Sequence, residues 1–218
     1  MKELIFMVCI GDSWQKSGRI AIEINRMYAE KNGYDFAVVD KTMDASKTPH
    51  WTKLLAMRQF IMSRKYDSVF YIDADAIFTD FGRRLEQVPN PNGLPVTICS
   101  ENKNLSDRRG ENTGTMLFKS CGESVELLDF SLSLYPECEH SCVFEQEGVG
   151  LALERRFSAI WNKLPCREMN SYFGRFALGL NKPHDLWRPG DFVMHMLRER
   201  EEYKNNVFSH FLAVAKNN

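Results

Sequence analysis

Short apolar runs and longer stretches with helical periodicity alternate through the first half of the chain. The apolar runs predict strands at residues 4–10, 36–39 and 68–72, and the periodic stretches predict helices at residues 17–32 and 50–65. The third run is apolar at nearly every position, which is typical of a strand buried on both faces. Because strands and helices alternate, we expect an α/β fold in which right-handed crossovers join parallel strands.

The second half of the chain is less regular. Its pattern predicts two strands and then two helices, at residues 95–100, 115–119, 125–134 and 148–156. Residues 165–191 are rich in Gly, Pro and Asn and are expected to form mostly loops. A short apolar run at 192–196 precedes a charged helix that is expected to begin near Leu197. No repeat or linker interrupts the pattern, so we predict a single domain over residues 1–218.

The composition is that of a globular protein with nearly balanced charge. The 218 residues include 28 basic and 29 acidic side chains, which give a net charge of −1. Without a basic excess, neither a nucleic acid nor an anionic membrane is an expected partner. The apolar run at 4–10 is too short to cross a membrane and lacks a cleavage site, so we expect a cytoplasmic protein with no membrane segment. Cys138 and Cys142 lack a second ligand pair with zinc-like spacing, and reduced thiols are expected.

Polar residues follow each of the three predicted strands of the first half. Gly11 and Asp12 follow the first strand, and Asp40 follows the second. Ligands of open α/β sheets gather at such strand ends, where Gly11 and Asp12 would let backbone approach a nucleotide and Asp40 would accept its hydrogen bonds. The third strand ends in Asp73 and Asp75. This pair can simply end a strand, but two carboxylates repel, and a divalent cation that also binds a diphosphate relieves the repulsion.

Five segments, in the same order along the chain, resemble the galactosyl-, mannosyl- and xylosyltransferases of yeast and plants. They are WTKLL at 51–55, YDSVFYIDADAIF at 66–78, NTGTMLF at 112–118, FEQE at 144–147 and GDFVMH at 190–195. A DxD pair alone is a weak signal, whereas five segments in order are a strong one.

The resemblance implies a GT-A fold, in which helices flank a mixed, mostly parallel sheet. It also implies a UDP-sugar donor, a Mn²⁺ (or Mg²⁺) cofactor and retention of the anomeric configuration. Matched by position, the implied metal ligands are Asp73, Asp75 and His195, and the implied sugar contacts are Asn112 and Gly114. Gln146, with its neighbours Glu145 and Glu147, would lie near the anomeric carbon or the acceptor and act in catalysis. An imidazole beside two carboxylates favours Mn²⁺ over Mg²⁺, although a histidine in an apolar strand can also be part of the core.

Three further residues are candidate contacts to the nucleotide. Lys53 and Arg58 lie on approximately one side of the predicted helix 50–65, where either can reach a donor phosphate, although helix charges are more often simply solvated. Ala74 lies between the two candidate metal ligands. On this assignment the nucleotide-binding half covers about residues 1–100, and the half for sugar and acceptor covers about residues 101–218.

The expected function is transfer of a hexose-type sugar from a UDP-sugar to a glycan or glycoprotein. Two features depart from the family. Its members usually carry an N-terminal membrane anchor, and small residues tend to follow the histidine, where this chain has Met196, Leu197 and Arg198. A short chain without an anchor also resembles a glycosyltransferase domain of chlorella viruses, which would make a viral capsid protein an acceptor in the host cytoplasm.

Two other functions compete with this one. In phosphohydrolases of the haloacid dehalogenase type, a DxD motif also follows an apolar strand. That family places the motif on its first strand and has Thr or Val where this chain has Ile77. The other alternative is a module that binds nucleotide sugars without turnover, against which the intact Asp73, Asp75, Gln146 and His195 argue.

Overall fold

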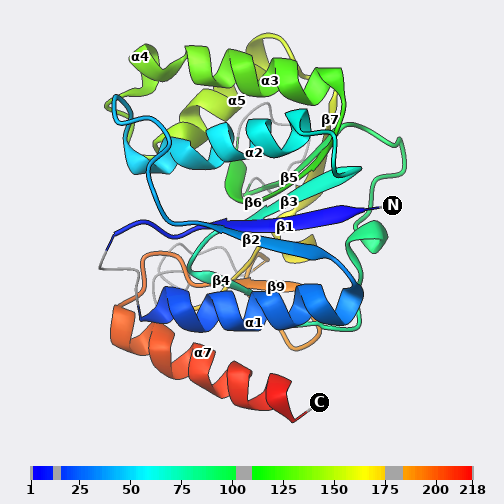
Figure 1. Cartoon of the computed structure of the whole chain (residues 1–218), viewed down its shortest axis with the longest axis vertical. Helices are drawn as coiled ribbons and strands as arrows, with labels where there is room; N and C mark the ends of the chain where they lie inside the picture. The colour runs from blue at the N-terminus through cyan, green and yellow to red at the C-terminus, as the bar shows by residue number, and fades with distance from the viewer. Residues whose placement is uncertain (1, 12–15, 102–109, 175–183, 218) are drawn as a thin grey trace.

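A mixed six-stranded sheet forms the centre of the molecule, which we describe from a computed structural model (Figure 1). The structure describes residues 2–11, 16–101, 110–174 and 184–217. The strand order of the sheet is β2-β1-β3-β6-β5-β7. These strands are β1 (Glu3–Val8), β2 (Asp35–Val39), β3 (Ser68–Ile72), β5 (Val96–Ser100), β6 (Glu111–Lys119) and β7 (Trp161–Pro165).

The direction of the strands brings several segments to one edge of the sheet. β1 pairs in parallel with both β2 and β3, so the carboxyl ends of these three strands meet at this edge. β6 is antiparallel to both β3 and β5, and its first residues therefore reach the same edge. The N–H of Asp73, just beyond β3, donates to the carbonyl of Gly114 in β6 at 2.9 Å.

Helices cover both faces of the sheet. α1 and α7 lie on one face, and α2, α3 and α5 lie on the other (Figure 1). Side chains of one strand alternate between two hydrophobic cores, one on each face of the sheet. In β1, Ile5 and Met7 join the core on the α1 side, and Leu4 and Phe6 join the core on the opposite side. The helices are α1 (Ser17–Asn32), α2 (Thr52–Met62), α3 (Gly122–Ser133), α4 (Tyr135–Cys138), α5 (Glu145–Arg155) and α7 (Glu201–Lys216).

A second, three-stranded sheet forms between the central sheet and α1. Its strands are β4 (Ala76–Phe78), β8 (Ser171–Tyr172) and β9 (Val193–His195), in the order β4-β9-β8. β4 begins immediately after Asp75 and pairs antiparallel with β9, which places Ala76 opposite His195. The buried amide of Asn25 on α1 bonds to β4 at two points, the Ala76 carbonyl at 3.0 Å and the Phe78 N–H at 2.9 Å. Asn25 thus anchors the segment that follows the DxD pair.

The structure confirms most of the predicted elements and corrects several. The predicted helix 50–65 is a short 3₁₀ turn (Pro49–Trp51) followed by α2. The helix predicted to start at residue 148 starts at Glu145, and its Gly148 and Gly150 lie close against the side chains of Trp51 and Glu111. Residues 165–191 were predicted to form mostly loops. Their described part contains a 3₁₀ turn (Cys166–Glu168) and the strand β8. Within the described ranges, no helix has the length and apolar character needed to cross a membrane.

Candidate active site

A cavity of about 860 Å³ lies at the edge where the carboxyl ends of the parallel strands meet the start of β6. That volume is within the usual range for pockets that bind small molecules. The cavity brings together most of the residues that the sequence singled out. The predicted residues that line it are Lys53, Asp73, Ala74, Asp75, Asn112, Gly114, Glu145, Gln146 and His195.

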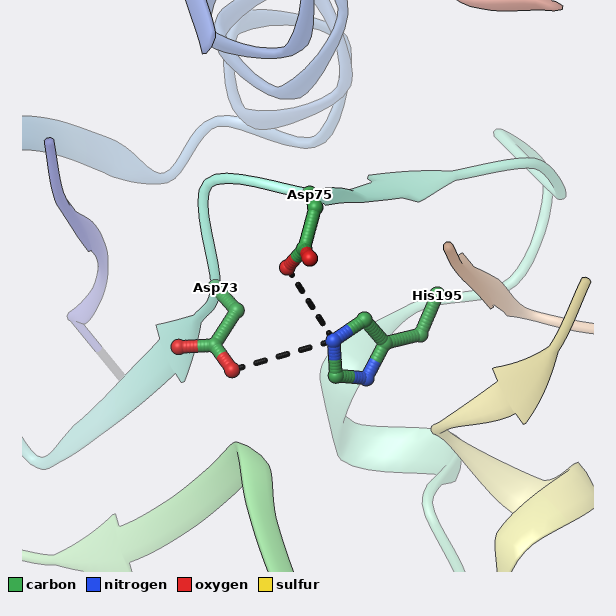
Figure 2. Close-up of side chains that lie close together, drawn as sticks. All are labelled: Asp73, Asp75 and His195. Atoms are coloured by element: carbon green, nitrogen blue, oxygen red, sulfur yellow. Dashed lines mark hydrogen bonds and ion pairs between the residues drawn. The ribbon is translucent and has the colours of Figure 1, made fainter. Parts of the chain in front are cut away.

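Asp73, Asp75 and His195 converge at one point of this cavity (Figure 2). Asp73 follows β3, Asp75 precedes β4, and His195 ends β9. The His195 Nε2 atom lies 3.1 Å from Oδ1 of Asp75 and 3.8 Å from Oδ2 of Asp73. One ligand atom from each residue lies within 4.8 Å of the other two, a spacing that suits a metal ion. His195 and Asp75 are buried, whereas the Asp73 side chain is 25% exposed, which leaves a ligand room to approach.

The charges of Asp75 and His195 support each other. Burial alone would raise the pKa of Asp75, but the attraction and hydrogen bond of His195 outweigh it and hold that pKa below its ordinary value. Burial alone would lower the pKa of His195, but Asp75 and then Asp73 outweigh it and raise that pKa. The site therefore favours a positive charge between the carboxylates, which a proton or a divalent cation can supply. Two carboxylates and an imidazole fit a divalent cation of the first transition row.

A second charged cluster lies beside the first and shares Asp73 with it. The buried Lys53 Nζ atom lies 3.1 Å from Oδ1 of Asp73 and 2.8 Å from Oε1 of Glu145. Burial opposes the charge of Lys53, but these two carboxylates outweigh it and raise the pKa of the amine. Tyr71 also donates to Asp73, and the Thr113 hydroxyl donates to Glu145 at 2.9 Å. Glu145 is therefore a buried carboxylate that already has a cation and a hydroxyl as partners.

Gln146 is the next residue of α5, and its side chain is oriented by β6. The N–H of Thr113 donates to Oε1 of Gln146 at 3.2 Å. Phe144, at the N-cap of α5, has φ 53° and ψ −125°, an unfavourable conformation for a residue with a side chain. Its ring stacks on His50 with 3.7 Å between the centroids, and both rings line the cavity. The strained residue thus directly precedes Glu145 and Gln146 at the start of α5.

Gly114 makes room for the imidazole of His195. A Cβ atom on Gly114 would lie 2.7 Å from Nδ1 of His195, which is closer than real side chains approach. The amide of Asn112 is held within the protein, since Oδ1 accepts from the Gly114 N–H at 2.9 Å and Nδ2 donates to Glu101 at 2.8 Å. Both residues line the cavity, and their predicted contact with the donor sugar stays a prediction.

Among the described residues, the other predicted site residues lie away from the cavity lining. The Arg58 guanidinium pairs with Asp129 of α3, on the outer side of α2. Asp40 is exposed just beyond β2, and Glu147 is partly buried on α5. Gly11, with φ 89°, ends the described segment after β1, and Asp12 lies outside the described residues.

Lys204, Glu101 and Asn170 are among the residues of the site that were not predicted from the sequence. Lys204 of α7 is buried, lines the cavity and helps to lower the pKa of Asp75 through its charge. Its Nζ atom lies 3.4 Å from Glu201, whose carboxylate accepts from the N–H of Ser17 at the start of α1 at 2.7 Å. Glu101 lines the cavity after β5, and Asn170 contacts His195 from behind. No local pattern marks these three residues, because each lies outside the sequence segments that resemble the family.

Comparison with known proteins finds distant relatives in sequence. No protein-family model matches the chain. The chain is 30% identical over 128 residues to probable xyloglucan 6-xylosyltransferase 3 of Arabidopsis thaliana, an alignment that covers 55% of this chain and 26% of that protein. It is 26% identical over 112 residues to xyloglucan 6-xylosyltransferase 4 of the same plant, covering 47% and 20%. The chain thus spans about a quarter of the length of the curated relatives that it matches. This similarity agrees with the resemblance seen in the five sequence segments.

Solved structures match over nearly the whole chain. A glycosyltransferase involved in the glycosylation of the major capsid of PBCV-1 matches with a TM-score of 0.74 and 13% identity, over 96% of this chain and 100% of that one. The galactosyltransferase LgtC, in complex with donor and acceptor sugar analogues, matches with a TM-score of 0.58 and 11% identity, over 97% and 95%. The apo form of the glycosyltransferase GlyE of Streptococcus pneumoniae matches with a TM-score of 0.62 and 12% identity, over 100% and 62%. The fold of this chain is the GT-A fold of glycosyltransferases, as the sequence resemblance implied.

Proposed function

We propose that this chain is a metal-dependent glycosyltransferase that moves a hexose-type sugar from a UDP-sugar to a glycan or glycoprotein. The observation that carries the proposal is the convergence of Asp73, Asp75 and His195 at the cavity of a GT-A fold. His195 lies 120 positions after Asp75 in the chain, so the fold itself assembles this group. The xylosyltransferase relatives and the glycosyltransferase structures support the same reaction class.

The proposed cofactor is Mn²⁺, or Mg²⁺, held by Asp73, Asp75 and His195. When bound, such an ion neutralises the charge of the diphosphate and stabilises it as a leaving group. The imidazole of His195 favours Mn²⁺ between the two. Lys204 is buried at the same cavity and supplies a fixed positive charge that we assign to the donor diphosphate.

We further propose that transfer proceeds with retention, by attack on the face from which the diphosphate leaves. A covalent sugar–enzyme intermediate would need a free carboxylate at the anomeric carbon. Glu145 is paired with Lys53 and Thr113, Glu147 lies outside the cavity lining, and Gln146 accepts a hydrogen bond through its side-chain oxygen. Under front-face attack, the leaving phosphate takes the proton of the acceptor hydroxyl, and Glu145 and Gln146 position the reacting groups.

The acceptor is proposed by class only, as a glycan or glycoprotein. The relatives in plants are named for xyloglucan, and the PBCV-1 enzyme for a major capsid. A donor panel for this chain should therefore contain UDP-xylose beside the UDP-hexoses and GDP-sugars, and an acceptor panel should contain both oligosaccharides and viral capsid protein.

The test is UDP binding with Mn²⁺ and with EDTA, followed by UDP release from a donor panel. Binding should require Mn²⁺, because two carboxylates repel a diphosphate in the absence of a cation. Equal affinity under both conditions would reject the metal-dependent reaction. Phosphate release from a generic aryl phosphate would favour the phosphohydrolase instead, and binding of a sugar nucleotide without UDP release across donors and acceptors would favour a non-catalytic module.

A further inference from the structure

A network of hydrogen bonds between buried side chains lies next to His195, and its first donor is a backbone N–H. The backbone N–H of Gly114 donates to Oδ1 of Asn112 at 2.9 Å. A backbone N–H can only donate, so the atom that it meets must be the amide oxygen of Asn112. The other amide atom of Asn112 is then Nδ2, which donates to the Glu101 carboxylate at 2.8 Å. Both ends of the Asn112 amide are thereby fixed.

The orientation passes from Asn112 to Asn170. The Asn170 side chain is fully buried, and its Nδ2 atom lies 2.7 Å from the Asn112 oxygen. Because that oxygen only accepts, the NH₂ group of Asn170 must face it, and the oxygen of Asn170 must face the other way. That oxygen lies 2.9 Å from Nδ1 of His195.

We infer that Asn170 is a positioning residue that keeps the proton of His195 on Nδ1 and so presents the lone pair of Nε2 to the metal; this inference rests on the proposed function. An amide oxygen only accepts, so Nδ1 must donate. In the neutral imidazole the lone pair then belongs to Nε2, the atom that faces Asp75 and Asp73 (Figure 2). Histidines that bind metals commonly donate their other N–H to such an outer partner, which fixes both the ring orientation and the tautomer.

Gly114 completes the arrangement through two separate contacts. Its N–H fixes the orientation of the Asn112 side-chain amide, and its lack of a side chain leaves space for the imidazole of His195. The hydrogen-bond network therefore links the NTG segment of β6 with His195 of β9 through Asn170, which belongs to neither segment.

The first test observes the proton without any variant. In ¹H–¹⁵N spectra of the metal-free and Mg²⁺-loaded wild-type protein, Nδ1 of His195 should carry a hydrogen-bonded proton in both states. A Nδ1 atom without a proton in either state would overturn the inference. This readout does not depend on sugar transfer, so it remains decisive even if the protein releases no UDP from any donor.

The second test measures Mn²⁺ affinity by direct titration, with no nucleotide present. Asn170→Ala should weaken Mn²⁺ binding by about 10- to 100-fold. Asn170→Asp keeps an oxygen facing Nδ1 but turns its second oxygen toward the Asn112 oxygen, so it should bind Mn²⁺ more tightly than Asn170→Ala and less tightly than wild type. The matched control is Thr115→Val, which removes a neighbouring buried bond to the Met169 carbonyl (3.0 Å). It should lower the melting temperature and leave Mn²⁺ affinity unchanged.

Equal Mn²⁺ affinities for Asn170→Ala and Thr115→Val would reduce Asn170 to a structural residue. A wild-type protein that binds no Mn²⁺ would instead reject the proposed function and the metal-directed part of the inference, and the Nδ1 proton would then test only the hydrogen bond from His195 to Asn170. If Asn170→Ala does not fold, Asn170→Asp and the wild-type spectra still test it.

Discussion

Buried carboxylates lie at both ends of the parallel strands, and their pKa values are shifted in opposite directions. At the amino end, Glu3 of β1 is buried and accepts a hydrogen bond from Ser68 of β3. Burial, followed by the charges of Glu86 and Asp67, raises its pKa to about 7. At the carboxyl end, Asp75 is also buried, yet His195 holds its pKa below the ordinary value. Without a facing cation, burial and neighbouring carboxylates thus raise the pKa of Glu3, whereas the facing His195 lowers the pKa of Asp75.

The difference favours the carboxyl end as the candidate functional end on physical grounds. An ionised carboxylate in a partly closed cavity is costly unless it is paired. Here the protein supplies Lys53 to Asp73 and Glu145, and it supplies His195 to Asp75. The first pairing uses the lysine ammonium, which stays charged. The second uses an imidazole, which can bind either a proton or a metal ion. Each of the predictions below changes one side of this comparison.

The largest expected effect follows loss of charge at Asp75. Asp75→Asn should lower UDP-sugar turnover by on the order of 10⁴-fold, because a bound cation contributes several kcal/mol of charge stabilisation in such reactions. Mn²⁺ affinity should fall with it. The control is Glu126→Gln, at an exposed carboxylate of α3 that lies away from the cavity lining, which should behave as wild type. An Asp75→Asn enzyme with normal Mn²⁺ affinity would contradict the metal assignment. Turnover is measured as UDP release over a range of Mn²⁺ concentrations.

The next effect concerns stability rather than turnover. Lys53→Met should lower the free energy of unfolding by about 4 kcal/mol, because it leaves the buried Glu145 carboxylate without a cation. The measurement is urea unfolding in the presence of EDTA, so that no bound metal contributes. Adding Glu145→Gln to Lys53→Met removes the unpaired charge and should recover part of the loss. A double variant no more stable than Lys53→Met would show that packing of the lysine stem, rather than charge, stabilises this cluster.

The first half of the fold was predictable because its signals are local. α1 begins at Ser17 and ends before Gly33, and β3 covers Ser68–Ile72, as the periodicity predicted. The DxD pair and His195 stand in segments that resemble a family. The strand-end carboxylate pair already made Asp73 and Asp75 candidate metal ligands, the resemblance added His195, and the fold brings the three together. The nucleotide, sugar and catalytic roles assigned to the other residues stay predictions.

The rest depends on contacts that are distant in sequence. β4 has only three residues, and it becomes a strand because β9, more than a hundred residues later, pairs with it. β7 carries polar residues among apolar ones and has no clear period. Asn170 and Lys204 reach the site through pairing of β8 with β9 and packing of α7 on α1, neither of which leaves a local pattern.

A smaller effect is expected in α5, where two neighbouring carboxylates differ in position. Glu145→Gln should slow transfer by about 10²-fold, as expected when a positioned reactant loses its support. Glu147→Gln is the comparison: Glu147 lies outside the cavity lining, so its loss should slow transfer less than the loss of Glu145. Mass spectrometry of the enzyme during turnover should show no sugar adduct. An adduct on either residue would replace front-face attack by double displacement and leave the transferase assignment standing.

The smallest effect tests the amino end of the sheet, where Glu3 has no role in the proposed reaction. Its pKa of about 7 lies above the ordinary value of 4.5, so the folded protein binds this proton more tightly than the unfolded chain does. The stability that the protonated Glu3 provides is fully present below pH 4.5 and is lost as the pH rises through about 7. Glu3→Gln has no such titration, so its melting temperature relative to wild type should increase between pH 5 and pH 8. Glu30→Gln, at an exposed position of α1, should show the same difference from wild type at both pH values. If the Glu3→Gln difference is also independent of pH, Glu3 is ionised in the folded protein, and burial without a facing cation does not neutralise a carboxylate at this end of the sheet.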